Sequence, residues 1–474
     1  MYNNITIPQE TVDRVLATAL SRGGHYADIF AENTHIGGIA LQDGVVSQAA
    51  QSVLYGAGVR TLCGDKTGYA YTMDLDEREL IRAAQSAACI ADGQALAGGS
   101  PYACSEAAAH RGVTESRYPM LRSWSDVGVG ERKDLLMNLD DYVHSLDARV
   151  VKVRAALNNR LQHVFFTNNL GESFTDVRPR ATLIVMVVMC QNGQTEMGYA
   201  SESLMMGAEF ISEERMKRVA RKAVEHASVL FDAVQPEGGE MPVVMAAGAS
   251  GILLHEAIGH AFEADFNRKG TSIFADKLGQ MICSPDITIV DDGTRTADQG
   301  ALNWDDEGVS GQRTVLVDHG RLHSYMHDRI SAAHYGVAPT GNGRRESFRS
   351  VPVPRMRSTY MLAGDASEED VIRSVRRGIY AESFTNGQVQ IGAGDFTFYM
   401  KQGRLIEDGK LTRPIRDINI IGNGPQALAD ISMVADNLII DPSSGMCGKE
   451  GQSVPVSQGL PTVLVNRLTV GGVG

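Results

Sequence analysis

The chain is organised around the stretch from Pro242 to Asp265, which predicts a short apolar strand, a small-residue turn and an apolar helix. The helical part carries His255 and His260, with Glu256 between them. A buried glutamate among alanine, isoleucine and leucine costs several kcal/mol unless a nearby group compensates its charge. A divalent cation held by the two imidazoles is such a group, so this stretch predicts a metal site. The alternative is that both histidines are packed, hydrogen-bonded residues of a buried helix.

The spacing of the two histidines predicts a distorted helix. They are five residues apart, one more than in the familiar zinc helix His-Glu-x-x-His. Five residues of an ideal α-helix rotate by roughly 140°, which would make the two rings diverge. A single-turn π-bulge would return both rings to one face, and Gly259 makes a local distortion cheap. We therefore predict a bent or bulged helix from Ala257 to His260. Glu256 would then lie beside the metal, where a carboxylate can take a proton from a bound water.

The two histidines leave a third ligand to be found, because a catalytic zinc usually has three protein ligands and one open position for water. The candidates are the cysteines and two nearby carboxylates: Cys63, Cys89, Cys104, Cys190, Cys283, Cys447, Glu263 and Asp265. Cys190 ends an apolar strand and Cys89 lies in an alanine-rich helix, which favours buried packing. Cys447 lies in residues 443–449, predicted to be a flexible loop, two residues before Lys449. That setting favours a thiolate near an ion.

Four segments give the chain a specific resemblance to a known family. They are His255–His260, the following Phe262–Gly270, Asp43–Val45 near the start and Gly445–Gly448 near the end. Together they resemble the TldD side of the TldD/PmbA family of metalloproteases, once labelled modulators of DNA gyrase. The similarity covers nearly the whole chain.

The resemblance implies a site, a substrate class and a partner. Zinc would be held by His255, His260 and Cys447, with Glu256 as general base. Substrates would be unfolded or flexible peptides. TldD-like chains work with a PmbA-like (TldE-like) partner that lacks the metal motif, and the sequence leaves open whether this chain forms that heterodimer or a homodimer.

Composition excludes several classes of function. The 474 residues, 43% of them hydrophobic, suggest a globular protein of two to three domain equivalents. A formal net charge of -13 argues against nucleic-acid binding, which needs a basic face. The longest apolar strand, near residues 181–190, is too short to span a bilayer, so we predict no membrane association and a cytoplasmic protein. The six cysteines show no paired spacing, which favours reduced thiols.

Periodicity and turn signals predict an α+β protein with two parts. Residues 1–235 would form an N-terminal α/β-meander domain with a candidate subdivision near 125, and residues 236–474 a C-terminal, mainly antiparallel β domain that carries the metal-binding helix. Helices are predicted at 8–21, 76–91, 130–145, 211–233, 366–377 (capped by Asp365) and 425–435. Strands are predicted at 26–32, 38–42, 45–47, 52–63, 68–73, 150–157, 163–168, 180–191, 287–291, 314–318, 379–384, 389–391, 396–401, 418–421, 437–440 and 462–469.

Two further clusters are candidate binding sites. His319, His323 and His327 have helical spacing, but residues 318–321 look like a turn, so a second metal site is not expected there. The basic residues in 343–357 are typical of a solvated loop; a role in binding carboxylates or peptide backbone beside the cleft is the alternative.

The function predicted from these features is a zinc-dependent endopeptidase acting on flexible peptides, with Glu256 as general base on a metal-bound water. One alternative is a non-catalytic peptide-binding or regulatory module with a structural zinc, which would need a closed site of four ligands. Another is a metal-dependent hydrolase of a non-peptide amide or ester.

Overall fold

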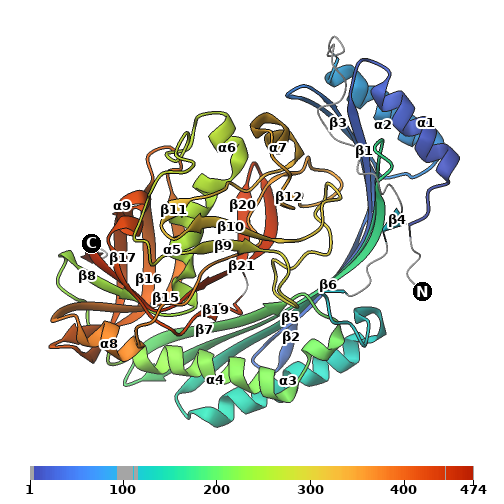
Figure 1. The fold of residues 1–474 in the computed structure, drawn as a ribbon. Helices are drawn as coiled ribbons and strands as arrows, with labels where there is room; N and C mark the ends of the chain where they lie inside the picture. Colours follow the sequence, from blue (N-terminus) through green and yellow to red (C-terminus); the bar gives the residue numbers. More distant parts are fainter. Residues whose placement is uncertain (1–4, 93–109, 112–115, 444, 473–474) are drawn as a thin grey trace.

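The structure is a computed structural model that describes residues 5–92, 110–111, 116–443 and 445–472. A seven-stranded sheet dominates the N-terminal half, with the order β3-β2-β1-β5-β6-β4 and with β7 paired to β6. Its strands are β1 (Tyr26–Gln42), β2 (Val45–Cys63), β3 (Lys66–Thr72), β4 (His110–Arg111), β5 (Val150–Asn168), β6 (Ser173–Gln191) and β7 (Gln194–Leu204). The long strands form a curved sheet around one side of the C-terminal half (Figure 1).

Helices cover the outer face of this sheet. The pair α1 (Gln9–Leu20) and α2 (Glu77–Ile90) packs at one end, and α3 (Val129–Leu146) with α4 (Glu213–Leu230) packs at the other (Figure 1). Alanine, valine and leucine on the inner faces of α3 and α4 join one core with alternate residues of β5 and β6. The short 3₁₀ turns η1 (Trp124–Asp126) and η2 (Ala208–Phe210) flank this layer.

The prediction of separate short strands was wrong for β1, β2 and β5, each of which is one continuous strand. Strands were predicted at 26–32 and 38–42, but β1 also continues through residues 33–37. A Cβ atom at Gly37 would lie 2.8 Å from the side-chain oxygen of Asn159, and one at Gly38 would lie 2.6 Å from that of Asn158. The two glycines therefore make room for side chains of β5 and do not form a turn. Asp43, with φ 51°, forms the hairpin turn that joins β1 to β2.

The C-terminal half contains a closed ring of strands. The sheet order β17-β16-β15-β8-β22-β18 closes because β17 also pairs with β22. These strands are β8 (Gly239–Met245), β15 (Arg377–Val389), β16 (Asp395–Glu407), β17 (Lys410–Asn423), β18 (Ile431–Val434) and β22 (Val463–Gly472). All pairings in it are antiparallel except β15 with β8. The predicted α+β class with a mainly antiparallel C-terminal half is confirmed.

A second sheet lies beside the ring, with the order β11-β10-β9-β14-β21-β19 and with β20 paired to β21. Its strands are β9 (Ile289–Asp292), β10 (Arg313–Asp318), β11 (Arg321–Leu322), β14 (Ser358–Met361), β19 (Ile439–Ile440), β20 (Gly445–Lys449) and β21 (Gln452–Leu460). The remaining elements are β12 (Gly343–Arg344), β13 (Val353–Pro354), α6 (Ala264–Arg268), α7 (Arg329–Tyr335), α8 (Glu368–Arg373) and α9 (Gly424–Ala429). The helical segment after β8 contacts strands of both sheets, β15 and β21 among them, and the largest core forms around it.

Three local predictions differ from the structure. Ser367, not Asp365, caps α8, because its side chain accepts a hydrogen bond from the Asp370 amide. The helix predicted over 425–435 ends at Ala429, and β18 follows it. The segment 443–449, predicted to be a flexible loop, contains strand β20. Among the described residues, no helix is both long and apolar enough to cross a membrane.

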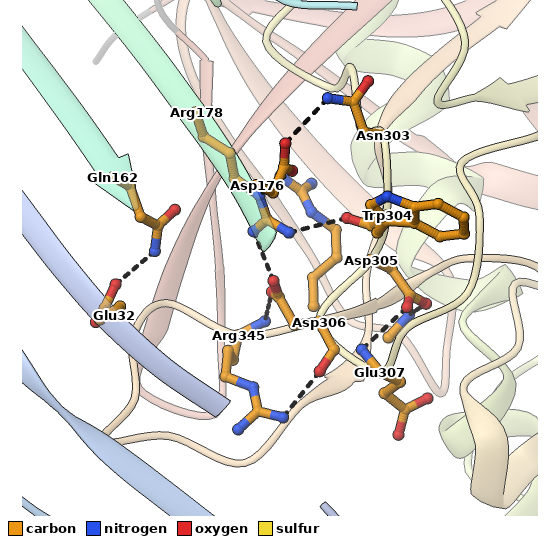
Figure 2. Close-up of polar contacts among 12 residues, drawn as sticks. Glu32, Gln162, Asp176, Arg178, Asn303, Trp304, Asp305, Asp306, Glu307 and Arg345 are labelled. Atoms are coloured by element: carbon orange, nitrogen blue, oxygen red, sulfur yellow. Dashed lines mark hydrogen bonds and ion pairs between the residues drawn. The ribbon is translucent and has the colours of Figure 1, made fainter. Parts of the chain in front are cut away.

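The two halves meet through buried ion pairs. Arg60 on β2 pairs with Asp28 on β1 and reaches Glu307 in the C-terminal half, and all three side chains are fully buried. A second link joins Arg178 of β6 to Asp306 at 2.6 Å, as Figure 2 shows. The pairs Arg60–Glu307 and Arg178–Asp306 join residues 247 and 128 positions apart in the sequence, one from each half.

The interpretation of residues 343–357 as a solvated loop was wrong. Arg344, Arg345, Arg355 and Arg357 are all buried. Arg357 pairs with Asp291 at 2.7 Å, and Arg345 donates to the backbone carbonyl of Asp306. These arginines do bind carboxylates and backbone carbonyls, as the alternative held, but the groups they bind belong to this chain.

Candidate metal centre

The helix that carries the two histidines is bulged. After β8 and the turn η3 (Ala249–Gly251), one α-helical turn, α5 (Ile252–Leu254), leads into a π-helical turn, η4 (His255–Gly259), and then η5 (His260–Phe262). The amide of His260 donates to the carbonyl of His255, the five-residue step of a π-turn. The predicted bulge is confirmed, and it starts two residues earlier than expected. The imidazole rings lie 5.1 Å apart between centroids.

Gly259 serves a different purpose from the predicted one. Its φ of -58° and ψ of -52° are ordinary helical values, so the bulge does not need the conformational freedom of glycine here. A Cβ atom at this position would lie 2.3 Å from Sδ of Met356 and 3.0 Å from the carbonyl oxygen of Leu254. Glycine therefore allows the bulged helix to approach Met356 closely.

The structure brings Cys447 to the two histidines. The ligand atoms of His255, His260 and Cys447 all lie within 4.8 Å of one another, and Sγ of Cys447 is 3.4 Å from Nε2 of His260. Around a tetrahedral zinc such atoms are roughly 3.3–3.6 Å apart, so small adjustments suffice for one ion. All three residues are buried. Within the described ranges, this is the group of His, Cys, Asp and Glu side chains with spacing suited to a metal.

Cys447 lies on β20, opposite Val454 of β21, and the hairpin turns at Glu450 and Gly451. Burial raises the pKa of the Cys447 thiol, but the charge and hydrogen bond of His255, followed by those of His260, lower it to about 4. A thiolate, the form that binds metals, is therefore favoured. Gly445 and Gly448, which are typical of a flexible loop, lie on this strand.

Glu263 orients His260. Its Oε2 lies 3.0 Å from Nδ1 of His260, which fixes the proton on Nδ1 and directs Nε2 toward Cys447. Burial raises the pKa of Glu263, but Lys449, His260 and Arg355 lower it to about 2, so the carboxylate stays ionised. Sequence reasoning considered Glu263 as a metal ligand and missed this role. The three-residue spacing from His260 was the signal that could have indicated it.

Lys449 and Asp265 also have roles that differ from those considered. Nζ of Lys449 lies 2.6 Å from Asp265 and 3.2 Å from Glu263, so its charge compensates these carboxylates. Asp265, another candidate third ligand, pairs with Lys449 and is not among the ligand atoms grouped around the two histidines and Cys447. The two pairs fasten the β20–β21 hairpin to the segment that follows the bulged helix.

Glu256 lies at the wall of a cleft of about 450 Å³ to which both halves contribute. The carboxyl group is half-buried, and its stem packs against Gly387, where a Cβ atom would lie 3.2 Å from its Cγ. Burial raises the pKa of Glu256, against the opposing charges of His255 and His260. Other residues lining the cleft are Met197, Tyr199, Lys222, His226, Phe384, Lys401 and Met446. Glu256 and His255 therefore share one accessible space.

His319, His323 and His327 do not come together on a helix. His319 has a φ of 44° in the turn between β10 and β11, as the sequence predicted, while His327 is buried ahead of α7. Burial lowers the pKa of His327 to about 4. It stays neutral and packs against Tyr335, at 5.4 Å between ring centroids.

Comparison with known proteins identifies the family. The PmbA/TldA metallopeptidase domain 1 matches residues 27–91, its central domain matches 122–231, and its C-terminal domain matches 238–472. A metalloprotease TldD homolog of Haemophilus influenzae is 39% identical over 94% of this chain and 93% of its own length. The chain belongs to the PmbA/TldD metallopeptidase family. The predicted enzyme class, a metallopeptidase, is thereby confirmed.

Other relatives support the same assignment. A metalloprotease TldD homolog of Buchnera aphidicola is 34% identical and covers 100% of this PmbA/TldD chain and 98% of the relative. A zinc metalloprotease TldD homolog of Saccharolobus solfataricus is 37% identical over 50% of this chain and 53% of its own length.

Solved structures share the fold. A protein of Thermotoga maritima described as a modulator of a DNA gyrase has a TM-score of 0.77 at 21% identity, with 98% of this chain and 99% of that chain covered. TldE of Thermococcus kodakarensis has a TM-score of 0.75 at 18% identity, covering 98% and 100%.

Proposed function

We propose that this chain is a zinc-dependent endopeptidase that hydrolyses unfolded or flexible peptides. His255, His260 and Cys447 would hold the zinc, and Glu256 would be the general base. The observation that carries the proposal is the π-turn, which points both imidazoles at the Cys447 thiol. Glu256, the residue after His255, faces the cleft. A catalytic zinc commonly has three protein ligands, and this group offers three.

Bound zinc would act as a Lewis acid that polarises the scissile carbonyl and acidifies a water. Glu256 would accept the proton of the attacking water and later pass it to the leaving amine. A carboxyl group whose pKa is raised by burial suits both steps, since it can hold a proton between them. Glu263 keeps Nε2 of His260 free for the metal throughout.

The cleft supports extended peptides as substrates. Strand β15 pairs with β8 only from Ile379 to Ala381, whereas its partner β16 follows it to Val389. Beyond Ala381, Ser383, Phe384 and Gly387 line the cleft beside Glu256. A peptide in extended conformation can add to such a strand edge through its backbone, which requires little sequence preference. The volume of about 450 Å³ suits a few extended residues and not a folded domain.

A second chain would cover part of the N-terminal sheet, either a metal-free PmbA-like (TldE-like) partner or another copy of this chain. Apolar side chains are exposed at Val45, Val46, Val53 and Tyr55 of β2. Exposed apolar patches of this kind mark interaction surfaces. The similar fold of a TldE protein supports a paired assembly of like-shaped chains.

The test is metal content by elemental analysis together with peptide hydrolysis. We expect about one zinc per chain, lost in His260→Ala and in Cys447→Ala. Glu256→Gln should keep the zinc and lose activity on a casein-derived unfolded peptide by roughly 10²–10⁴-fold. Normal activity of Glu256→Gln would refute the assignment of the base. Zinc in a closed four-ligand site, without peptidase activity, would favour a regulatory module.

A further inference from the structure

A small cavity with five arginines lies between the N-terminal sheet and the C-terminal half. Its volume is about 40 Å³, enough for a few water-sized groups. The arginines that line it are Arg160, Arg178, Arg180, Arg344 and Arg345. Its other walls include Gln162 on β5, Pro455 on β21 and two carboxylates, those of Asp306 and Glu346.

Two of these arginines repel each other directly. Arg160 on β5 stands opposite Arg180 on β6 in the antiparallel register, so both side chains lie on the same face of the sheet. The next pair along this face is Gln162 with Arg178. Like charges directly opposite each other destabilise a pair of strands. Something must offset this repulsion for both charges to be kept next to each other.

Carboxylates neutralise one side of the cavity. Arg178 pairs with Asp176 at 2.9 Å and with Asp306 at 2.6 Å, and Asp306 also accepts from the Arg345 amide (Figure 2). Arg345 has a further carboxylate, Asp28, at 3.7 Å. These two arginines are therefore balanced by acidic groups of the chain.

On the other side of the cavity, the charges of Arg180 and Arg344 are not balanced by ion pairs with carboxylates. Arg344 donates to two backbone carbonyls, those of Met356 and Pro455. Arg180 contacts Sδ of Met446 at 3.2 Å. Within the part of the chain that the structure describes, neither Arg180 nor Arg344 has a carboxylate in ion-pair range. Burial, and then the charge of Arg160, lowers the pKa of Arg180 to about 10.

Arg160 has only a distant and shared carboxylate. Oε2 of Glu32 lies 3.6 Å from its guanidinium, but the same oxygen already accepts hydrogen bonds from Thr34 and Gln162. Nη2 of Arg160 donates to the backbone carbonyl of Glu346 at 3.4 Å, and the Glu346 carboxylate accepts from the Ser453 amide. Nε of Arg160 is buried without a hydrogen-bond partner. Unmet donors and excess positive charge in an enclosed space are what an anion would satisfy.

We propose that this cavity binds a small oxyanion, a phosphate ion or the carboxylate group of a peptide, between Arg160, Arg180 and Arg344. Guanidinium forks match the planar or tetrahedral oxygens of such groups. The volume admits a group of that size and nothing much larger. The bound anion would link the two halves of the chain through its oxygens.

The anion would lie next to the metal-binding hairpin. Pro455 and Val454, which line the cavity, pair with Met446 and Cys447. Met446, which Arg180 contacts, also lines the cleft that holds Glu256. A peptide in the cleft could therefore supply its carboxyl terminus to the cavity. This source rests on the proposed peptidase function, whereas binding of free phosphate does not.

The test is titration of the holoenzyme with inorganic phosphate at constant ionic strength, followed by calorimetry and by thermal unfolding. We expect saturable binding that raises the unfolding temperature. Arg180→Gln should weaken binding roughly tenfold or more, and Arg160→Gln should do the same. Arg154→Gln, an exposed arginine on the same face of β5, is the matched control and should bind like the parent.

A merely structural arginine would behave differently. Without phosphate, Arg180→Gln should unfold at a higher temperature than the parent, because it removes the repulsion from Arg160. A lower unfolding temperature in Arg180→Gln, no saturable binding by the parent, or equal binding by parent and Arg180→Gln would overturn the proposal.

Competition separates the two sources. Acetyl-tetra-alanine with a free carboxyl terminus displaces phosphate if peptides are the ligand, and the same peptide with an amidated terminus does not. Displacement by neither peptide assigns the site to a free anion. Loss of peptidase activity in every form of the enzyme would refute the proposed function and leave the phosphate result standing.

Discussion

At the scale of single residues, the ligand group depends on side chains that do not touch the ion. Glu263 holds the ring of His260, and Lys449 with Arg355 keeps that carboxylate ionised. The sequence motif predicted His255, Glu256 and His260 as a unit, because their spacing is local. The motif could not predict that Glu263 orients His260, because Arg355 and Lys449, which compensate the Glu263 carboxylate, lie 92 and 186 residues further along the chain.

Glu263→Gln tests this supporting role. The amide keeps the shape of the side chain but removes the charge that orients His260. We expect zinc affinity to fall by roughly 10–100-fold in competition with a chelator, as for other second-layer partners of metal-binding histidines. Glu214→Gln, whose side chain is exposed, is the matched control. Unchanged zinc affinity in Glu263→Gln would contradict the role.

Gly259→Ala tests the contact between the bulged helix and Met356. In an ordinary helix this change would stabilise by up to about 1 kcal/mol. Here the new Cβ would meet Sδ of Met356, so we expect a loss of about 1–3 kcal/mol in the free energy of unfolding, measured with urea. Gly130→Ala, with open space around it in α3, should be neutral or stabilising. Equal effects of the two changes would rule out the contact as the reason for glycine.

At the scale of elements, local sequence patterns predicted the type of a helix or strand better than its length. The bulge followed from one extra residue between the histidines, because helix geometry fixes the rotation per residue. The length of β1 could not be predicted, because Gly37 and Gly38 act as space for β5 side chains and this is visible only once the sheet is formed. The same applies to β20, whose partner strand supplies the hydrogen bonds.

Lys449→Met tests how β20 is fastened. Removing the ammonium leaves Asp265 buried without its cation and Glu263 with only His260 and Arg355, so we expect the free energy of unfolding to fall by about 3–5 kcal/mol in urea titrations. Lys410→Met, an exposed lysine at the start of β17, is the control and should change it by less than about 0.5 kcal/mol. A small effect in Lys449→Met would show that the β20–β21 hairpin is held by backbone pairing alone.

At the scale of the whole molecule, the ion pairs between the halves were beyond sequence reasoning. Arg60 and Glu307 are 247 residues apart, and a buried arginine gives no local signal that separates it from a solvated one. The α+β class and the mainly antiparallel C-terminal half were predictable from periodicity. The division into residues 1–235 and 236–474 and the three zinc ligands stay predictions.

Arg60→Met tests whether these pairs hold the halves together. Without the guanidinium, Asp28 and Glu307 lose their shared partner in a fully buried site. We expect the free energy of unfolding to fall by about 3–5 kcal/mol. Arg376→Met, whose side chain is almost fully exposed, should change it by less than about 0.5 kcal/mol. A loss below about 1 kcal/mol in Arg60→Met would show that packing alone joins the halves.

The position of Cys447 on a strand, and not in a loop, affects how the enzyme would exchange its metal. His260 and Cys447 are 187 residues apart in the sequence. If Cys447 lay in a flexible loop, the chain would have to bring these two ligands together each time an ion binds. The hairpin and the pairs of Lys449 already close that span. Loss and recapture of the ion would therefore be governed by access through the cleft and not by refolding, so a demetallated enzyme should recover on a mixing timescale.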